Sequence, residues 1–430
     1  MDAFTAVVRR LLSACPPPAQ CKCERAVKIL RLCFYPSFPH LVSIGRAVED
    51  TVSRGDTDRL EFEFTGQIPN SSDLIADRQA EWGQQFMSLF HACPIAFQWL
   101  TSLSLKSLEL GDFVLPSLLG ACDKLKHLSL RSCTLDEHSV LKIDMPNSVI
   151  HTLEFIHFRC KRIDLISVPK LTRLVCYSWE LDNPPLHFGY VPDLLMVNLA
   201  SCAKASQAPF ALSECFSTNT RSLSRLSLSF SLQMVSQFLP TTTTSYASTY
   251  DFSTKSSFVP LFFLLQIWIK PEHPKQLTPM FTKLTDLVLW SIFPECDLNW
   301  TLFILEAAPA LQKFTLNRTR HSCVKTPEDS AEKVNVVWEP SKDLKHQNLK
   351  LLVMMGFEEE DKVANYIRLV MERSAALKTI KLHCITCEAC DAIGPEGSRR
   401  SEVDKASRRR VKERLTHGSS VSVKIIISDG

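Results

Sequence analysis

The densest cluster of potential metal ligands lies in the segment HCITCEAC, toward the C-terminal end of the chain. It holds His383, Cys384, Cys387 and Cys390, and imidazole and thiolate groups are the usual zinc ligands in proteins. A structural zinc site normally needs a second group of closely spaced ligands, which the sequence does not supply. Cys384 and Cys387 also fall where we expect a strand to end and turn, a common place for buried thiols. We therefore predict no metal site and no cofactor.

The run RRSEVDKASRRRVKERL, residues 399–415, is strongly basic. Such runs serve as nuclear localisation signals or as phosphate-binding patches. The alternative, which we favour, is a solvent-exposed helix, because Asp404 and Arg408 lie four residues apart and can pair on one helix face. The whole chain has a formal net charge of only +3. We therefore predict no nucleic-acid partner.

Residues with a catalytic pattern are not found in the sequence. There is no phosphate-binding Walker loop, no G-x-S-x-G nucleophile elbow and no H-E-x-x-H zinc motif. His127 and Cys133 could suggest a thiol–imidazole pair, but they fall on different parts of one repeat and no third group is implied. We predict no catalytic residues and a protein that is not an enzyme.

The composition is typical of a soluble folded protein, with 45% hydrophobic and 22% charged residues among 430. Arg9 and Arg10 stand where a signal peptide needs its apolar core, so we expect an intracellular protein with reduced cysteines, cytoplasmic and/or nuclear. The most apolar run, 258–269, is too short to cross a bilayer and contains Pro260 and Gln266. We predict no membrane association.

A six-residue pattern, L-x-x-L-x-L or a close variant, recurs along the chain and sets its architecture. Its first six copies are separated by 25, 25, 21, 23 and 29 residues, the length of a leucine-rich repeat. Two weaker copies lie upstream, in 26–34 and 58–64. The ten clear copies begin at Leu100, Leu125, Ile150, Leu171, Leu194, Leu223, Leu284, Leu311, Leu349 and Leu377.

This period predicts an α/β leucine-rich-repeat solenoid, a horseshoe with a parallel β-sheet on its concave face and helices or irregular turns outside. Alternate residues of a strand face opposite sides, so the two apolar residues of x-L-x-L share one side. A single strand cannot bury that side, but stacked copies share a continuous core. We expect returning helices over 299–308 and 361–377, the latter with Val363, Ile367, Val370 and Met371 at helical spacing.

Several longer stretches resemble plant F-box/leucine-rich-repeat proteins. They are ERAVKILRLCF (24–34), LVSIGRAVEDTVSRGDTDRLEFEF (41–64), PECDLNWTLFILEAAPALQKFTL (294–316) and the block WEPSKDLKHQNLK…LKTIKL (338–382). The last block is similar to the C-terminal FBD region of that family. In that family the F-box binds a Skp-type adaptor of a cullin ubiquitin ligase, and the repeats recruit the protein to be ubiquitinated. The resemblance thus implies a Skp-type adaptor, a cullin and a protein substrate as partners.

We divide the chain by composition and by this resemblance. The Ser/Thr-rich stretch has no amphipathic pattern and is expected to be disordered, and TPEDSAEK (326–333) is expected to be an exposed loop. The predicted parts are an N-terminal segment without a recognisable F-box at 1–25, repeats at 26–234, the Ser/Thr-rich insertion at 235–262, repeats at 263–325, an FBD-like region that continues the repeats at 326–393, and a charged helix with a terminal strand at 394–430.

The strand residues that alternate with the buried leucines should form the surface that meets a partner. Arg, Tyr and Trp are the side chains that most often dominate binding energy. For any single position, an ordinary solvated strand residue is an equal alternative. The candidate partner-binding residues on this concave face are Lys106, His127, Ser129, Arg131, Arg173, Tyr177, Arg225 and Trp290.

Three functional hypotheses remain open at this point. The first is a protein-interaction module that resembles the substrate-recognition subunit of a cullin-type ubiquitin ligase. The second is a repeat-only binding or decoy protein with no ubiquitin-ligase link, because a recognisable F-box is missing. The third is a non-functional fragment.

Overall fold

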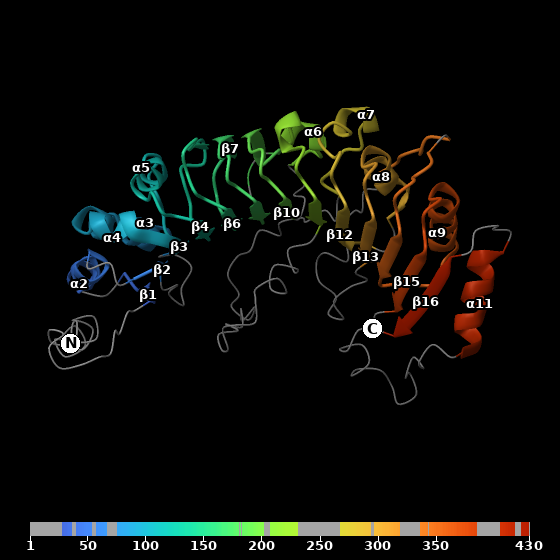
Figure 1. Cartoon of the computed structure of the whole chain (residues 1–430), viewed down its shortest axis with the longest axis horizontal. Coiled ribbons are helices and arrows are strands. Elements are labelled where there is room, and N and C mark those ends of the chain that lie inside the picture. The colour runs from blue at the N-terminus through green and yellow to red at the C-terminus, as the bar shows by residue number, and fades with distance from the viewer. Residues whose placement is uncertain are drawn as a thin grey trace. The chain divides into compact units, whose positions relative to one another are not determined.

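Figure 1 shows the computed structural model of the chain. The chain divides into two compact units, Met1–Leu194 and Leu195–Gly430. We describe each unit by itself. The residues that the structure describes are 28–36, 40–53, 57–66, 75–179, 181, 183–201, 207–230, 267–293, 296–318, 336–342, 344–384, 405–417 and 423–429. The predicted N-terminal segment 1–25, the insertion 235–262 and the loop 326–333 lie outside them.

The first unit contains a parallel sheet in which each strand pairs with the next copy of the repeat (Figure 1, blue to green). The two weak upstream copies form its first two strands, as the pattern predicted. The strands are β1 (Ile29–Phe34), β2 (Arg59–Thr65), β3 (Leu100–Lys106), β4 (His127–Arg131), β6 (Thr152–Ile156) and β8 (Arg173–Tyr177).

The repeated leucines of this sheet are stacked in register. Leu103, Leu128, Leu153 and Leu174 are successive cross-strand partners, and each is at most 1% exposed. A fully buried Leu side chain contributes about 1.5–3 kcal/mol through the removal of apolar surface from water. Single strands could not bury these residues, so the stack is stable only as a set. The predicted core side of these strands is confirmed.

Four of these six strands end in the same sharp turn. Ser107, Ser132, His157 and Ser178 directly follow β3, β4, β6 and β8, and all four have φ between 50° and 59°. In three of these turns the left-handed residue donates its amide to the carbonyl of the last residue of the next strand, at 2.8–2.9 Å. These hydrogen bonds offset the cost of left-handed backbone in non-glycine residues.

The segments between the strands return in two different ways. Where the connections are long they contain helices: α2 (Leu41–Ser53), α3 (Ile75–Ala92), α4 (Pro94–Trp99) and α5 (Val114–Ala121). Farther along the unit they contain a second parallel sheet of β5 (Val140–Asp144), β7 (Arg162–Ser167) and β9 (Leu186–Tyr190).

This second sheet corrects the prediction of helices or irregular turns at these positions. The repeats there are only 21–25 residues long, and an extended return with alternating apolar residues buries its inner face in few residues. Leu141, Ile143, Ile163 and Leu165 alternate in this way and are all at most 3% exposed.

The second unit contains another parallel sheet built from later copies of the pattern (Figure 1, green to red). Its two buried rows begin at Val197 and Leu199 and run strand by strand to Ile425 and Ile427. The strands are β10 (Met196–Ala200), β11 (Arg225–Ser229), β12 (Asp286–Ile292), β13 (Lys313–Arg318), β14 (Leu351–Met355), β15 (Thr379–Cys384) and β16 (Lys424–Asp429).

The helices of the second unit include both that the sequence predicted. The first is a 3-10 turn, η4 (Asn299–Thr301), followed by α8 (Leu302–Ala307), and the second is α9 (Asp361–Arg373), whose four predicted apolar residues are buried. The prediction extended α9 to residue 377, but Ser374 leaves helical geometry at φ −124° and ψ 88° and the chain runs into β15. The others are α6 (Leu212–Cys215), η2 (Thr218–Thr220), α7 (Pro274–Leu277) and α11 (Lys405–Thr416).

The charged C-terminal part forms a helix and a strand, as predicted. Helix α11 packs against α9 and buries Val411 and Leu415 (Figure 1). Arg414 forms ion pairs with Glu359 and Asp361 at the start of α9. Within the described residues, every helix is too short or too polar to span a lipid bilayer.

Candidate functional site

The outward side chains of β3, β4, β6 and β8 form one surface of the first unit, which we call the first face. The parallel register aligns them in three rows that cross the strands. The rows are Ser102, His127, Thr152 and Arg173; Ser104, Ser129, Glu154 and Val175; and Lys106, Arg131, Ile156 and Tyr177.

Six of the eight predicted binding residues belong to the first face, and they differ in exposure. Lys106 and Arg173 are exposed, and His127 and Arg131 are half-buried. Ser129 and Tyr177 are only 1% and 7% exposed, so the expectation that all six side chains face solvent is wrong for these two. Arg131 covers Ser129, since its Nε donates to the Ser129 hydroxyl at 3.1 Å.

Glu154 is a charged residue of the first face that the sequence analysis did not select. It lies on β6, is 14% exposed and pairs with Arg131 of the neighbouring strand at 3.3 Å. Its strand was recognised as a repeat, IHTLEF, so the same x-L-x-L rule would have placed Glu154 on the outward side. Because its partner carboxylate is mostly covered, the Arg131 side chain is held in place and much of its charge is neutralised.

His127 is neutral near pH 7 on the first face. Burial lowers its pKa from the ordinary value, Arg131 and Arg173 lower the pKa further, and Glu154 raises it without reversing the net shift. The permanent charges of the face are therefore three cations, Lys106, Arg131 and Arg173, against the single carboxylate of Glu154.

On the outward side of the two preceding strands, β1 and β2, the charged residues are arranged differently. Glu61 of β2 is only 9% exposed and pairs with Arg31 at 2.5 Å and with Arg59. Glu63 is exposed and accepts a hydrogen bond from Thr65 at 3.3 Å. The two carboxylates of β2, next to the first face, thus contact side chains of β1 and β2: Glu61 pairs with two arginines and Glu63 accepts a hydrogen bond from Thr65.

The remaining two predicted residues, Arg225 and Trp290, lie on the second unit. Outward residues of β11, β12 and β13 form its second face, where Asp286 lies between two cations, 3.6 Å from Arg225 and 3.7 Å from Lys313. Trp290 is half-buried on the same face. Since the two faces belong to separate units, we treat them as separate surfaces.

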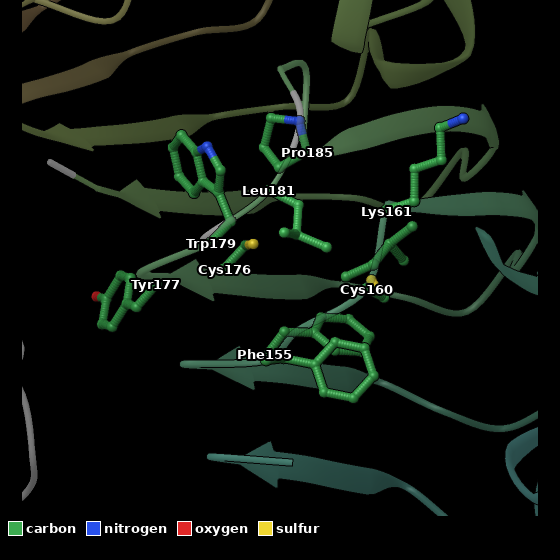
Figure 2. Close-up of a pocket in the computed structure, with 10 residues that line it drawn as sticks. Phe155, Cys160, Lys161, Cys176, Tyr177, Trp179, Leu181 and Pro185 are labelled. Carbon is green, nitrogen blue, oxygen red and sulfur yellow. The ribbon is translucent and has the colours of Figure 1, made fainter. Parts of the chain in front are cut away.

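A small cavity of the first unit lies between its two sheets (Figure 2). It is lined mainly by apolar side chains, among them Phe155, Cys160, Cys176 and Trp179, while the ammonium of Lys161 points away from it. The cavity has room for about one water molecule. It is a packing defect of the core and too small for an organic ligand.

The potential zinc cluster can be followed only in part. His383 Nδ1 lies 2.8 Å from the Ser428 hydroxyl on the neighbouring strand, whereas Cys387 and Cys390 fall outside the described residues. In the ranges that the structure describes, three or more His, Cys, Asp or Glu side chains do not gather at any point in a way suited to a metal ion.

The thiol of Cys133, considered above with His127, is part of the core. It is fully buried, and its Sγ lies 3.4 Å from the carbonyl oxygens of Leu105 and Arg131. Burial raises the pKa of this thiol to about 12. Cys133 is therefore a neutral side chain near pH 7, and its role is packing beneath the turn that follows β4.

Comparison of the whole sequence with models of known protein families gives no match, and comparison with curated proteins gives none either.

Proposed function

We propose that the chain is a non-enzymatic protein-interaction module with a leucine-rich-repeat horseshoe fold. By its resemblance to plant F-box/leucine-rich-repeat proteins with an FBD-like region, it would recruit a target protein for a cullin-type ubiquitin ligase. The 21–29-residue spacing of the first repeats and the register of their leucines support the repeat assignment.

The observation that carries the proposal is the arrangement of the outward side chains on the first face. The buried leucines hold four strands in register, so twelve outward positions form an ordered array of polar, charged and apolar groups. Such an array on a rigid sheet can recognise a surface of another protein without rearranging its own backbone. Lys106 and Arg173 are the exposed members with the longest side chains.

Co-purification tests the ubiquitin-ligase part of the proposal. The full chain is expressed with a tag together with a plant Skp-type adaptor and cullin, and the purified material is analysed by gel filtration and mass spectrometry. Co-elution of adaptor, cullin and chain in fixed ratio is the expected result. Circular dichroism of the chain alone establishes that it is folded.

A folded chain that elutes without adaptor or cullin would contradict ligase membership. In that case the second hypothesis, a repeat-only binding or decoy protein, replaces it, and the first face keeps its role as the binding surface. A chain that does not fold would instead favour the hypothesis of a non-functional fragment.

A further inference from the structure

Two cations of the first face form no ion pair with a described residue; the exposed Glu63, on the strand next to Lys106, accepts a hydrogen bond from Thr65 instead. The side chains of Lys106 and Arg173 are exposed and make no ion pair or hydrogen bond to any residue that the structure describes. Arg131, by contrast, is paired with Glu154. The available positive charge of the face is therefore concentrated at two points.

The register fixes how far apart these points are. Lys106 is in the third row of β3 and Arg173 is in the first row of β8, three strands and four residues away. With strands about 4.8 Å apart and a rise of about 3.3 Å per residue, the two Cα positions are separated by about 20 Å. An extended peptide covers this distance in about six residues.

The surface between the two cations suits a peptide backbone. The diagonal from Lys106 to Arg173 crosses β4 where the Arg131 guanidinium covers Ser129, and it passes between Thr152 and the Glu154 carboxylate that pairs with Arg131. The half-buried side chains of Arg131 and Thr152 can donate hydrogen bonds to the carbonyl groups of a peptide backbone. Of the two aromatic rings among the twelve outward residues, Tyr177 is buried and His127 is half-buried, so the face offers little of the exposed aromatic surface on which single-stranded nucleic acids stack.

We propose that the first face binds an extended acidic segment of a partner protein, with one carboxylate at Lys106 and a second, about six residues away, at Arg173. The inference rests on the proposed function and names the class of target that it would recruit. Electrostatic attraction at two separated points sets both the orientation and the spacing of the acidic residues.

A displayed library of short random peptides tests this directly, with the purified full chain as bait. Selected peptides should be enriched in pairs of Asp or Glu about five to seven residues apart. Their affinity, measured by fluorescence anisotropy, should fall as salt is raised from about 50 to about 300 mM.

Matched variants locate the binding to the first face. Lys106→Gln and Arg173→Gln should each weaken binding of a selected peptide by about two- to five-fold, and together by about ten-fold or more. Lys142→Gln removes an exposed lysine of β5, on the second sheet of the same unit, and should leave the affinity unchanged. Circular dichroism checks that all variants are folded.

Three results would overturn the inference. The first is that the library yields no peptides, or peptides without acidic pairs. The second is that the Lys106→Gln/Arg173→Gln double variant binds a selected peptide as tightly as the unsubstituted chain does. The third is that the chain binds single-stranded oligouridylate as tightly as it binds the selected peptide. None of them alters the outcome of co-purification with adaptor and cullin, so failure of this inference and failure of the proposed function are distinguishable.

Discussion

Replacement of Gly356 by alanine should destabilise the second unit strongly. Gly356 directly follows β14 and has φ +68°, and a Cβ built on it would lie 2.0 Å from the carbonyl oxygen of Arg318 at the end of β13. Left-handed backbone costs a residue with a side chain about 1–2 kcal/mol. Relief of the overlap needs β13 and β14 to separate, at about 1 kcal/mol for each hydrogen bond that is weakened. We expect a total loss of about 3 kcal/mol or more.

Gly120→Ala is the matched control for this prediction. Gly120 lies in α5, and nothing is within 4 Å of the Cβ that alanine would add, so the substitution should leave stability unchanged or raise it by up to about 1 kcal/mol. Urea unfolding followed by circular dichroism gives both values. A Gly356→Ala variant as stable as the unsubstituted chain would refute the close approach of β14 to β13 at this turn.

Three further predictions concern the core. Leu128→Ala should lower the free energy of unfolding by about 2–5 kcal/mol in urea titrations, because Leu128 is 1% exposed between Leu103 and Leu153; a loss below about 1 kcal/mol would contradict the leucine stack. Burial lowers the pKa of His346 more than its hydrogen bond to the Ala308 carbonyl raises it, and its Nδ1 accepts the amides of Asn348 and Leu349. The unfolded chain therefore binds a proton at His346 more readily than the folded chain, and the free energy of unfolding should fall as pH drops below 6.5, the ordinary pKa of histidine. His346→Gln should reduce this fall between about pH 7 and about pH 5.5. An unchanged dependence of the free energy of unfolding on pH would contradict the assignment. Cys133, with its pKa raised to about 12, should resist iodoacetamide in the native chain and react after unfolding, as measured by peptide mass spectrometry, and rapid native labelling would contradict its burial.

The core of the sheets was predictable because burial imposes a simple rule on the sequence. Leu103 and Leu105 sit two residues apart in one strand, and their equivalents recur at nearly constant intervals, so the alternation and the period together predict parallel strands in register. The same rule placed Lys106, Arg131 and Arg173 on the outward side.

The second sheet of the first unit and the exposure of single residues were not predicted. The segments VLKID and RIDLIS alternate between polar and apolar residues, which is typical of a strand. The expected helices or irregular turns at these positions did not take this alternation into account. Ser129 is covered by the guanidinium of Arg131. This contact depends on the conformation of the arginine side chain, which residue types and spacing do not predict. The ion pair between Arg131 and Glu154 likewise depends on side-chain conformation, although the pairing of their strands was predictable.

The most direct test of the central claim is a quantitative comparison of the proteins that three forms of the full chain retain: unsubstituted, Lys106→Gln/Arg173→Gln, and Lys142→Gln. Affinity purification with isotope-labelled mass spectrometry measures the amount of each retained protein. If the first face is the recognition surface, the unsubstituted chain and Lys142→Gln retain the same target in equal amounts, and the double variant loses most of it. Equal retention by all three folded forms would show that recognition, if it occurs, uses another surface, and would contradict the account.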